Sequence, residues 1–327
     1  MKCIVRITAG LLTAAMLFSF SGCASDEAGT YDIYKTSYHY GIVKGVEHQS
    51  EGYFLSKDIC LMPSSDLGTD QTHAQVAQAA GVFNTVTKQT LYAQNVGGVL
   101  YPASTTKLLT LYVALKYGDL DKEYTVSELA VDQDSDSSVC HLAAGDVLTL
   151  RQMLYGMILR SGNDGAMAVA EAVSGDVETF VALMNREALS LGATHSHFVN
   201  PHGLHDDQHY TTVYDMYLIF QEAVKNPAFL EILCTKEYDA TYRGANGQAK
   251  NQHWSSTNQY LNGKETAPEG ITVLGGKTGT TGKAKYCLVL LSQNERNEPL
   301  ISIVFGADCR SNLYLLMNEI LSFGKAM

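Results

Sequence analysis

The chain has 327 residues, of which 46% are hydrophobic and 17% are charged, so it can bury an ordinary globular core and is not a disordered chain. Its formal net charge is -11 at pH 7, and no cluster of Lys and Arg stands out. This excludes nucleic acid as a partner, because phosphate binding needs such clusters. An acidic surface restricts the ligand no further, since a local basic site can bind an anion on a globally acidic protein.

The first 23 residues have the pattern of an export signal. A basic start precedes an apolar run from Ile7 to Phe20, which is shorter than the ~20 residues of a membrane-spanning helix, so cleavage is expected. The small pair Ser21-Gly22 directly before Cys23 resembles a lipoprotein signal, in which the cysteine is lipidated. We therefore expect an exported protein, lipid-anchored to the membrane through Cys23, on the outer face of the cytoplasmic membrane or in the periplasm. An ordinary signal peptide that ends near Ala24 is the alternative.

Residues 24–75 are rich in Ser, Gly, Asp and Tyr and lack sustained periodicity, so we interpret them as a linker or tether to the domain formed by residues 76–327. A flexible stretch of about 50 residues reaches roughly 40 Å by random-coil scaling. Four tyrosines leave open that this segment packs on the folded domain instead. These tyrosines are Tyr31, Tyr34, Tyr38 and Tyr40.

Regular elements are predicted from the start of the domain to its middle. Strand-like runs at Ala79 to Asn84 and Gln89 to Ala93 indicate a hairpin, and a helix begins just after Pro102. A capping box at Thr149 to Gln152 opens an amphipathic helix that ends near Arg160. Two more helices follow, at 166–173 and 177–191, each closed by a glycine. The middle of the chain is therefore predicted to be helical.

Strands return near the end of the chain, at 271–280, 284–292 and 300–306, before a final helix at about 312–323. Strands from the two ends of a chain commonly form one sheet, with the middle as an inserted lobe and a binding cleft between the two. We therefore predict an α/β (α+β) fold, with a mainly antiparallel sheet flanked by helices and an inserted all-helical lobe at about 118–240.

Ser104 and Lys107 form the first candidate catalytic pair. Residues three apart share a helix face, and Pro102 favours a helix start that puts Ser104 in the first turn, where free backbone N–H groups stabilise negative charge. Lys107 can act as the base for Ser104 only if its pKa is lowered by burial or by a neighbouring cation. The S-x-x-K spacing is common by chance and carries little weight alone.

Two further polar motifs follow. Ser161-Gly162-Asn163 lies in a predicted turn, where the Ser161 hydroxyl can relay a proton and the Asn163 amide can hold a peptide backbone. The run from Gly275 to Thr281 lies late in a strand, where its glycines allow a substrate backbone to approach the sheet edge. Lys277 and the threonine hydroxyls could receive a terminal carboxylate, and the Lys277 ammonium would help to keep Lys107 neutral.

The three motifs in this order resemble those of the low-molecular-weight penicillin-binding proteins, the serine D-alanyl-D-alanine carboxypeptidases, from about Ala79 to the C-terminus. The resemblance implies a β-lactamase/transpeptidase-like fold with the motifs in the cleft between the lobes. It implies an enzyme, active on peptidoglycan pentapeptides that end in D-Ala-D-Ala and inhibited covalently by β-lactams. Four connecting segments also look like the family's. They are 154–159, 180–185, 198–204 and 209–212 with Asp215.

The resemblance also assigns roles. Ser104 would be the acylated nucleophile, Lys107 its base and Ser161 the proton relay to the leaving D-alanine. The predicted substrate-binding residues are Asn163, Lys277, Thr278, Gly279 and Thr280, with the backbone N–H groups of Ser104 and Thr280 as the oxyanion hole. Lys285 stands where the family usually has glycine, which puts the edge of the next strand in doubt. We expect no extra C-terminal domain or amphipathic anchor of the kind seen in many relatives, so membrane attachment would depend on Cys23.

Two alternative functions stay open. A β-lactamase shares the motifs but needs a carboxylate for fast deacylation and prefers Asp where Gly162 stands. Glu222 and Asn226 have a suitable E-x-x-x-N spacing but lie far downstream, and we interpret this match as accidental. A non-catalytic wall-binding or β-lactam-sensing lipoprotein is disfavoured because the three motifs are intact.

We expect neither a metal nor another cofactor. Five histidines with Asp206 and Asp207 form a tempting cluster, but two of them fall in the family segments and no ligand spacing is clear. The cysteines after Cys23 are odd in number and lack a C-x-x-C pair, so we interpret them as small buried hydrophobes, although export allows one disulfide. The histidines are His195, His197, His202, His205 and His209.

Overall fold

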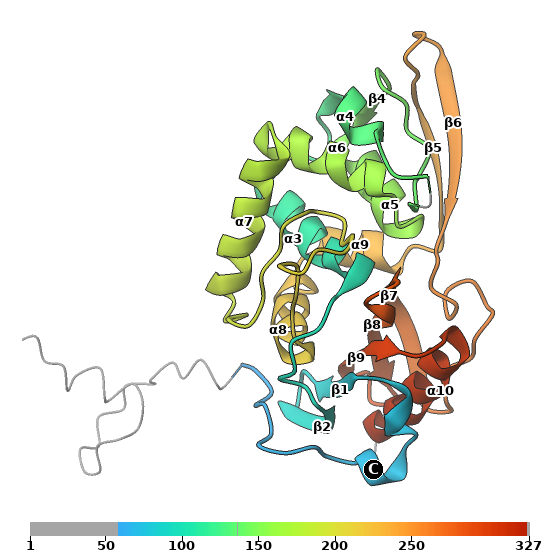
Figure 1. Ribbon diagram of the computed structural model, residues 1–327. Helices are drawn as coiled ribbons and strands as arrows, with labels where there is room; N and C mark the ends of the chain where they lie inside the picture. Colours follow the sequence, from blue (N-terminus) through green and yellow to red (C-terminus); the bar gives the residue numbers. More distant parts are fainter. Residues whose placement is uncertain (1–57, 136, 326–327) are drawn as a thin grey trace, which may run out of the picture. The chain divides into compact units, whose positions relative to one another are not determined.

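Two antiparallel sheets organise the part of the chain that the computed structural model describes, residues 58–135 and 137–325. The larger sheet has five strands in the order β2-β1-β9-β8-β7, so strands from both ends of the domain form one sheet, as predicted (Figure 1). Strand β7 lies at its edge, which leaves one side of β7 unpaired within this sheet. The strands are β1 Ala79–Asn84, β2 Gln89–Gln94, β7 Ile271–Thr281, β8 Lys285–Asn294 and β9 Pro299–Ala307.

Helices cover both faces of this sheet. Helix α10, Arg310–Leu321, packs its buried side chains against Leu290 and Val304 on one face. Helix α8, Val213–Ala223, covers the other face, where the ring of Tyr217 stacks on Phe83 at 4.1 Å between centroids. The prediction of a mainly antiparallel sheet flanked by helices is therefore confirmed.

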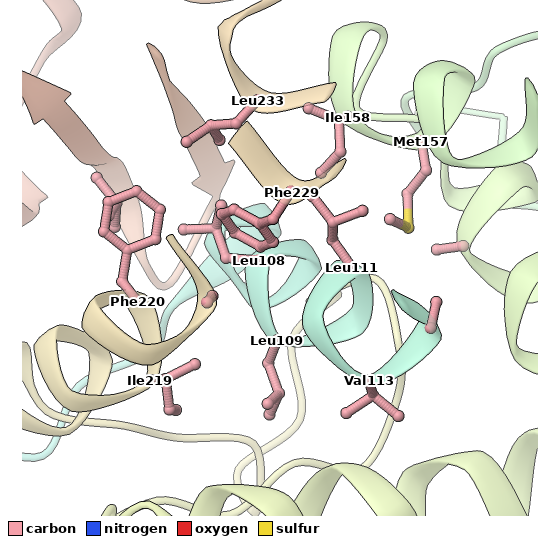
Figure 2. Close-up of a cluster of buried hydrophobic side chains, with 14 of the residues drawn as sticks. Leu108, Leu109, Leu111, Val113, Met157, Ile158, Ile219, Phe220, Phe229 and Leu233 are labelled. Carbon is pink, nitrogen blue, oxygen red and sulfur yellow. The ribbon is translucent and has the colours of Figure 1, made fainter. Parts of the chain in front are cut away.

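Helix α3, Lys107–Tyr117, packs among the helices of the inserted lobe, which therefore begins earlier than the predicted start at about 118, and α3 is buried along most of its length. Figure 2 shows its leucines surrounded by side chains of α5, α8 and α9, so the apolar side chains of α3 pack against several neighbouring helices. The predicted capping box is present, with Thr149 and Gln152 bonded to each other's backbone at the start of α5. The other helices of the lobe are α4 Glu128–Val131, α5 Leu150–Leu159, α6 Asn163–Ser174, α7 Val177–Ser190 and α9 Pro227–Cys234.

The prediction of an all-helical lobe is wrong in one respect, although the fold class is confirmed. A second, four-stranded sheet lies in and beside this lobe, in the order β3-β4-β5-β6. Its outer hairpin buries Trp254, whose indole N–H donates to the carbonyl of Cys140 at 3.0 Å. The strands are β3 Glu123–Thr125, β4 Val147–Thr149, β5 Glu237–Arg243 and β6 Ala249–Ser255.

Residues 58–75, which we assigned to the tether, pack on the folded domain and belong to the same compact unit, Asp58–Met327. The backbone N–H of buried Cys60 donates to the Tyr217 hydroxyl at 2.7 Å, and Leu67 pairs with Ala93 beside β2. The segment contains short 3-10 helices, η2 Thr69–Gln71 and η3 Ala74–Val76; another, η5 Ser322–Gly324, follows α10.

The predicted signal, Cys23 and most of the tether lie outside the described residues. Among the residues that are described, no helix is long and apolar enough to cross a membrane.

Candidate active site

A strained turn carries Ser104 into the buried helix α3. The 3-10 helix η4, Ala103–Thr106, follows Pro102 and runs directly into α3, as the Pro102 signal predicted. Ala103 has a left-handed backbone with φ of 49°, which non-glycine residues adopt only when their surroundings enforce it. Gly203 packs on this turn so closely that a Cβ there would lie 1.9 Å from the Ala103 carbonyl oxygen. The close packing of Gly203 therefore restricts the backbone directly before Ser104.

Lys107 is fully buried and directs its amine at Ser104. Its Nζ lies 3.1 Å from Ser104 Oγ, and it also donates to Asn163 Oδ1 and to the carbonyl of His202, both at 2.8 Å. Burial lowers the pKa of Lys107 well below its ordinary value, and the positive charge of Lys277 lowers it further. The nearby carboxylate of Asp164 acts in the opposite direction. The condition that we set for Lys107 as a base, a lowered pKa, is met.

Ser161 occupies the sharp turn between α5 and α6, with a left-handed φ of 58°. Its hydroxyl accepts a hydrogen bond from Lys277 Nζ at 2.9 Å. Asn163 is the first residue of α6 and not part of the turn, because the backbone enters the helix directly after Gly162. The second motif therefore contacts both lysines, Ser161 through Lys277 and Asn163 through Lys107.

Strand β7 brings Lys277 to the same site from the large sheet. Lys277 is fully buried, and burial lowers its pKa to about 7. Its Nζ also donates to the Thr278 carbonyl at 2.8 Å. A Cβ at Gly279 would lie 2.9 Å from the backbone nitrogen of Ser104, so only glycine lets β7 pass this close to the Ser104 turn. The three motifs thus converge from η4, the α5–α6 turn and the edge of the sheet.

A cavity of about 180 Å³ opens where these elements meet. Ser104 and Ser161 line it together with Thr278, Gly279 and Thr280, and each buried lysine reaches it through the serine that it contacts. Every residue that we predicted in the three motifs therefore lies at this site. Cys23, the predicted lipidation site, lies outside the described residues.

Sequence reasoning missed several residues that line the same cavity. Arg310 brings a permanent positive charge to it from the start of α10, with its guanidinium 6.0 Å from the ring centroid of Tyr286. The Thr257 hydroxyl lies 2.7 Å from that of Thr278. No motif surrounds Arg310 or Thr257, and only the fold brings them to Ser104. The other residues that line the cavity are Ser138, Cys287, Leu313 and Tyr314.

Lys285 begins β8 and pairs with Thr281, so the strand edge that we had questioned is formed. Its φ is 56°, a conformation that glycine adopts more easily.

Glu222 does not line the cavity that contains Ser104. It pairs with Lys225 on the surface, and Asn226 caps α9.

Two of the five histidines, His202 and His209, lie in the interior. His202 and His209 are buried, which lowers the pKa of His202 to about 3 and that of His209 to about 4, so both rings are neutral near pH 7. Within residues 58–135 and 137–325, no three His, Cys, Asp or Glu side chains are placed to hold a metal ion.

The described cysteines carry free thiols, and three of them are buried as we expected. These three are Cys60, Cys140 and Cys287.

Known proteins are similar to this chain in sequence and in fold. The family described as D-alanyl-D-alanine carboxypeptidase, peptidase family S11, matches residues 68–309. The chain is 32% identical over 253 residues to the D-alanyl-D-alanine carboxypeptidase DacF of Bacillus subtilis, covering 76% of this chain and 62% of DacF. A D-alanyl-D-alanine carboxypeptidase of Streptomyces sp. strain K15 is 32% identical over 233 residues, with 68% of this chain and 78% of that protein covered.

Solved structures of related proteins have a similar fold. The crystal structure of the Streptomyces K15 DD-transpeptidase superposes with a TM-score of 0.70 at 29% identity, covering 76% of this chain and 97% of that one. The chain spans less than two thirds of DacF but almost the whole of the K15 structure. The match extends over the sheet, the helical lobe and all three motifs, and the chain therefore belongs to the D-alanyl-D-alanine carboxypeptidase family.

Proposed function

We propose that this protein is a serine D-alanyl-D-alanine carboxypeptidase that removes the terminal D-alanine of peptidoglycan stem peptides through an acyl-enzyme on Ser104. The observation that carries the proposal is the 3.1 Å approach of the buried Lys107 amine to Ser104 Oγ, beside a second buried lysine that contacts Ser161 at 2.9 Å. Family membership supports the substrate, since the related proteins are named for this activity.

Ser104 is activated by Lys107 as a neutral amine. Asn163 Oδ1 and the His202 carbonyl can only accept hydrogen bonds, so they take the two N–H groups of a neutral amine. The lone pair of Nζ is then free for the Ser104 proton. As Ser104 Oγ attacks the carbonyl carbon of the penultimate D-alanine, its proton passes to Lys107.

Ser161 returns a proton to the leaving group. The nitrogen of the departing D-alanine must be protonated as its C–N bond breaks, and Ser161 lines the cavity with a hydroxyl that can donate. Lys277 supports this step because its ammonium donates to Ser161 Oγ and replaces the proton that Ser161 gives up. Water then attacks the ester on Ser104. Lys107 returns its proton to Ser104 Oγ, one proton of the water passes to Lys277 and the other to solvent, and the shortened peptide leaves as a carboxylate.

The oxyanion forms between the Ser104 turn and β7. By similarity to the family, the backbone N–H groups of Ser104 and Thr280 stabilise the negative charge on the carbonyl oxygen. The close packing of Gly279 on the Ser104 backbone supports this role, because it brings the two N–H groups into the same region. The unpaired edge of β7 can also bind the substrate backbone as an added strand.

The terminal carboxylate binds at the Arg310 end of the cavity. The threonine hydroxyls of Thr278 and Thr280 can donate to it, and Arg310 adds a charge that is independent of pH. Lys277 contributes a second positive charge below its pKa of about 7. We therefore add Arg310 and Thr257 to the predicted substrate-binding residues.

The protein acts outside the cytoplasm, anchored through a lipid on Cys23. Its proposed substrate is a cell-wall peptide, which supports action beyond the membrane. The Ser21-Gly22-Cys23 sequence supports lipidation after cleavage of the signal. Labelling cells with a radioactive fatty acid tests this, since Cys23→Ser should abolish incorporation into the protein.

The experiment that tests the activity is D-alanine release from a pentapeptide ending in D-Ala-D-Ala, measured for the folded part of the chain and for its Ser104→Ala variant. We expect release only from the wild type. Equal release by both proteins would remove Ser104 from its role, and no release by either would favour the non-catalytic sensor. Rapid turnover of a chromogenic cephalosporin, in place of a lasting covalent complex, would favour a β-lactamase.

A further inference from the structure

We infer that His209 is a positioning residue that fixes the turn carrying Ser104, and that it acts through the hydroxyl of Thr106. His209 is 2% exposed and does not line the Ser104 cavity, so it has no direct part in the proposed chemistry. Its Nε2 lies 2.8 Å from Thr106 Oγ1. Thr106 immediately precedes Lys107, so this contact joins the segment around His209 to the proposed catalytic pair.

The hydrogen bonds around His209 have a defined direction. The backbone N–H of Val199 donates to His209 Nδ1 at 3.2 Å, so Nδ1 is unprotonated and Nε2 carries the hydrogen of the neutral ring. Nε2–H therefore donates to Thr106 Oγ1. The Thr106 hydroxyl in turn donates to the Ala103 carbonyl at 2.8 Å. A continuous chain of hydrogen bonds thus runs from the His209 ring to the residue before Ser104.

This chain ends where the backbone is strained. Ala103 holds a left-handed φ of 49°, and its carbonyl oxygen is also the atom on which Gly203 packs. A non-glycine residue keeps such a conformation only if the structure around it fixes it. The hydrogen bond from Thr106 orients the Ala103 carbonyl, and the Ala103 conformation sets the direction in which Ser104 leaves the turn.

The ring of His209 is itself well fixed. Phe198 meets it edge to face, with 5.4 Å between the ring centroids and an interplanar angle of 90°. Burial lowers its pKa to about 4, although Asp206 opposes this effect and Lys107, His197 and His205 add to it. The ring therefore stays neutral at neutral pH and keeps the donor on Nε2.

The inference rests on the proposed function, because it concerns the placement of the proposed nucleophile. Its test uses the rate constant for acylation of the purified protein by a fluorescent penicillin. His209→Ala should lower this rate constant about 10- to 100-fold, since a misplacement of about 1 Å has effects of this size. His209→Gln should stay within about threefold of wild type, because its amide nitrogen reaches a similar position and keeps the donor.

Two further variants separate positioning from stability. Thr106→Val removes the hydroxyl through which the same hydrogen bonds run, so its acylation rate constant should match that of His209→Ala. The rate constant of the double variant should be no lower than that of either single variant. Ile320→Ala, on the buried side of α10, should lower the melting temperature as much as His209→Ala does but leave acylation near the wild-type rate. Wild-type acylation by His209→Ala, or losses that multiply in the double variant, would overturn the inference.

Amide hydrogen exchange of peptides covering 103–107 provides a readout that needs no activity. We expect faster exchange in His209→Ala, and wild-type exchange in His209→Gln and Ile320→Ala. If the wild type itself failed to react with penicillin, the proposed function would fail and the exchange measurement alone would decide the inference. Unchanged exchange in His209→Ala would then reject it.

Discussion

Lys277 lowers the pKa of Lys107, although the two residues belong to different lobes, one in β7 of the large sheet and the other in helix α3. Burial is the larger cause of the lowered pKa of Lys107, and the positive charge of Lys277 adds to it. The packing of the two lobes therefore helps to make the Lys107 amine available as a base. The rate of Ser104 acylation should therefore depend on both lysines and on pH.

Replacing Lys107 tests the need for a neutral amine. Lys107→Ala should lower acylation of Ser104 by about 10²- to 10⁴-fold, the usual contribution of a general base. Lys107→Arg should not restore the rate, because a guanidinium keeps its proton at any accessible pH. The rate constant for labelling by a fluorescent penicillin measures both effects. Acylation at the wild-type rate by the arginine variant would contradict the role of Lys107 as base.

The pH profile of kcat/KM tests the two charges separately. Activity requires neutral Lys107, so it should rise with pH through the lowered pKa of that residue. It should fall above about pH 7 as Lys277 loses the charge that binds the carboxylate, since burial lowers the pKa of Lys277 to about 7.

Removal of the Lys277 charge should move the rising limb of this profile. In Lys277→Ala the pKa of Lys107 loses one of its two lowering causes, so the rising limb should shift to higher pH. The falling limb due to Lys277 should disappear. A rising limb at the same pH in both proteins would show that Lys277 does not act on Lys107.

Gly203 and Gly175 form a matched pair for the Ser104 turn. Both have a left-handed φ, 89° and 88°, but a Cβ at Gly203 would strike the Ala103 carbonyl, whereas nothing lies within 4 Å of one at Gly175. Gly175→Ala should cost about 1–2 kcal/mol of unfolding free energy and leave acylation unchanged. Gly203→Ala should also lower acylation more than about tenfold, because the turn must shift. Denaturant unfolding and penicillin labelling measure the two effects, and equal behaviour of both variants would refute the packing argument.

Arg310 should matter only for substrates with a free C-terminal carboxylate. Arg310→Gln should raise KM for a pentapeptide ending in D-Ala-D-Ala by about tenfold or more, because a charge-assisted hydrogen bond contributes about 1.5–3 kcal/mol. Acylation by a thioester substrate that lacks this carboxylate should change little. A similar loss with both substrates would mean that Arg310 supports the cavity rather than the carboxylate.

The large sheet could be predicted because its strands have strong local signals, and the three motifs because they occur together in the order that the family shows. The apolar runs of β8 and β9 and the capping box at Thr149 mark their own elements in the sequence. Strands β5 and β6 carry a weaker signal that we did not use. In Glu237–Arg243 polar residues alternate with Tyr238, Ala240 and Tyr242, the pattern of a half-buried strand. Half of the residues of the two strands are exposed, so the hairpin also depends on cross-strand pairs and on the burial of Trp254.

The other features that the sequence did not predict are also held in place by contacts between distant parts of the chain. Residues 58–75 show no periodicity because contacts with distant residues, such as Tyr217 and Ala93, hold them in place. Arg310 and Thr257 are single polar residues without a motif, and they join the site only when α10 and the segment after β6 pack beside β7. The same holds for His209, whose partner Thr106 is 103 residues away.

The measurement that tests the central claim most directly is the identification of the residue that benzylpenicillin acylates. The purified protein is incubated with the drug, digested and analysed by mass spectrometry. We expect one stable adduct, on the peptide that contains Ser104, and its absence in Ser104→Ala. An adduct on another residue, or an unchanged adduct in the Ser104→Ala protein, would contradict the account.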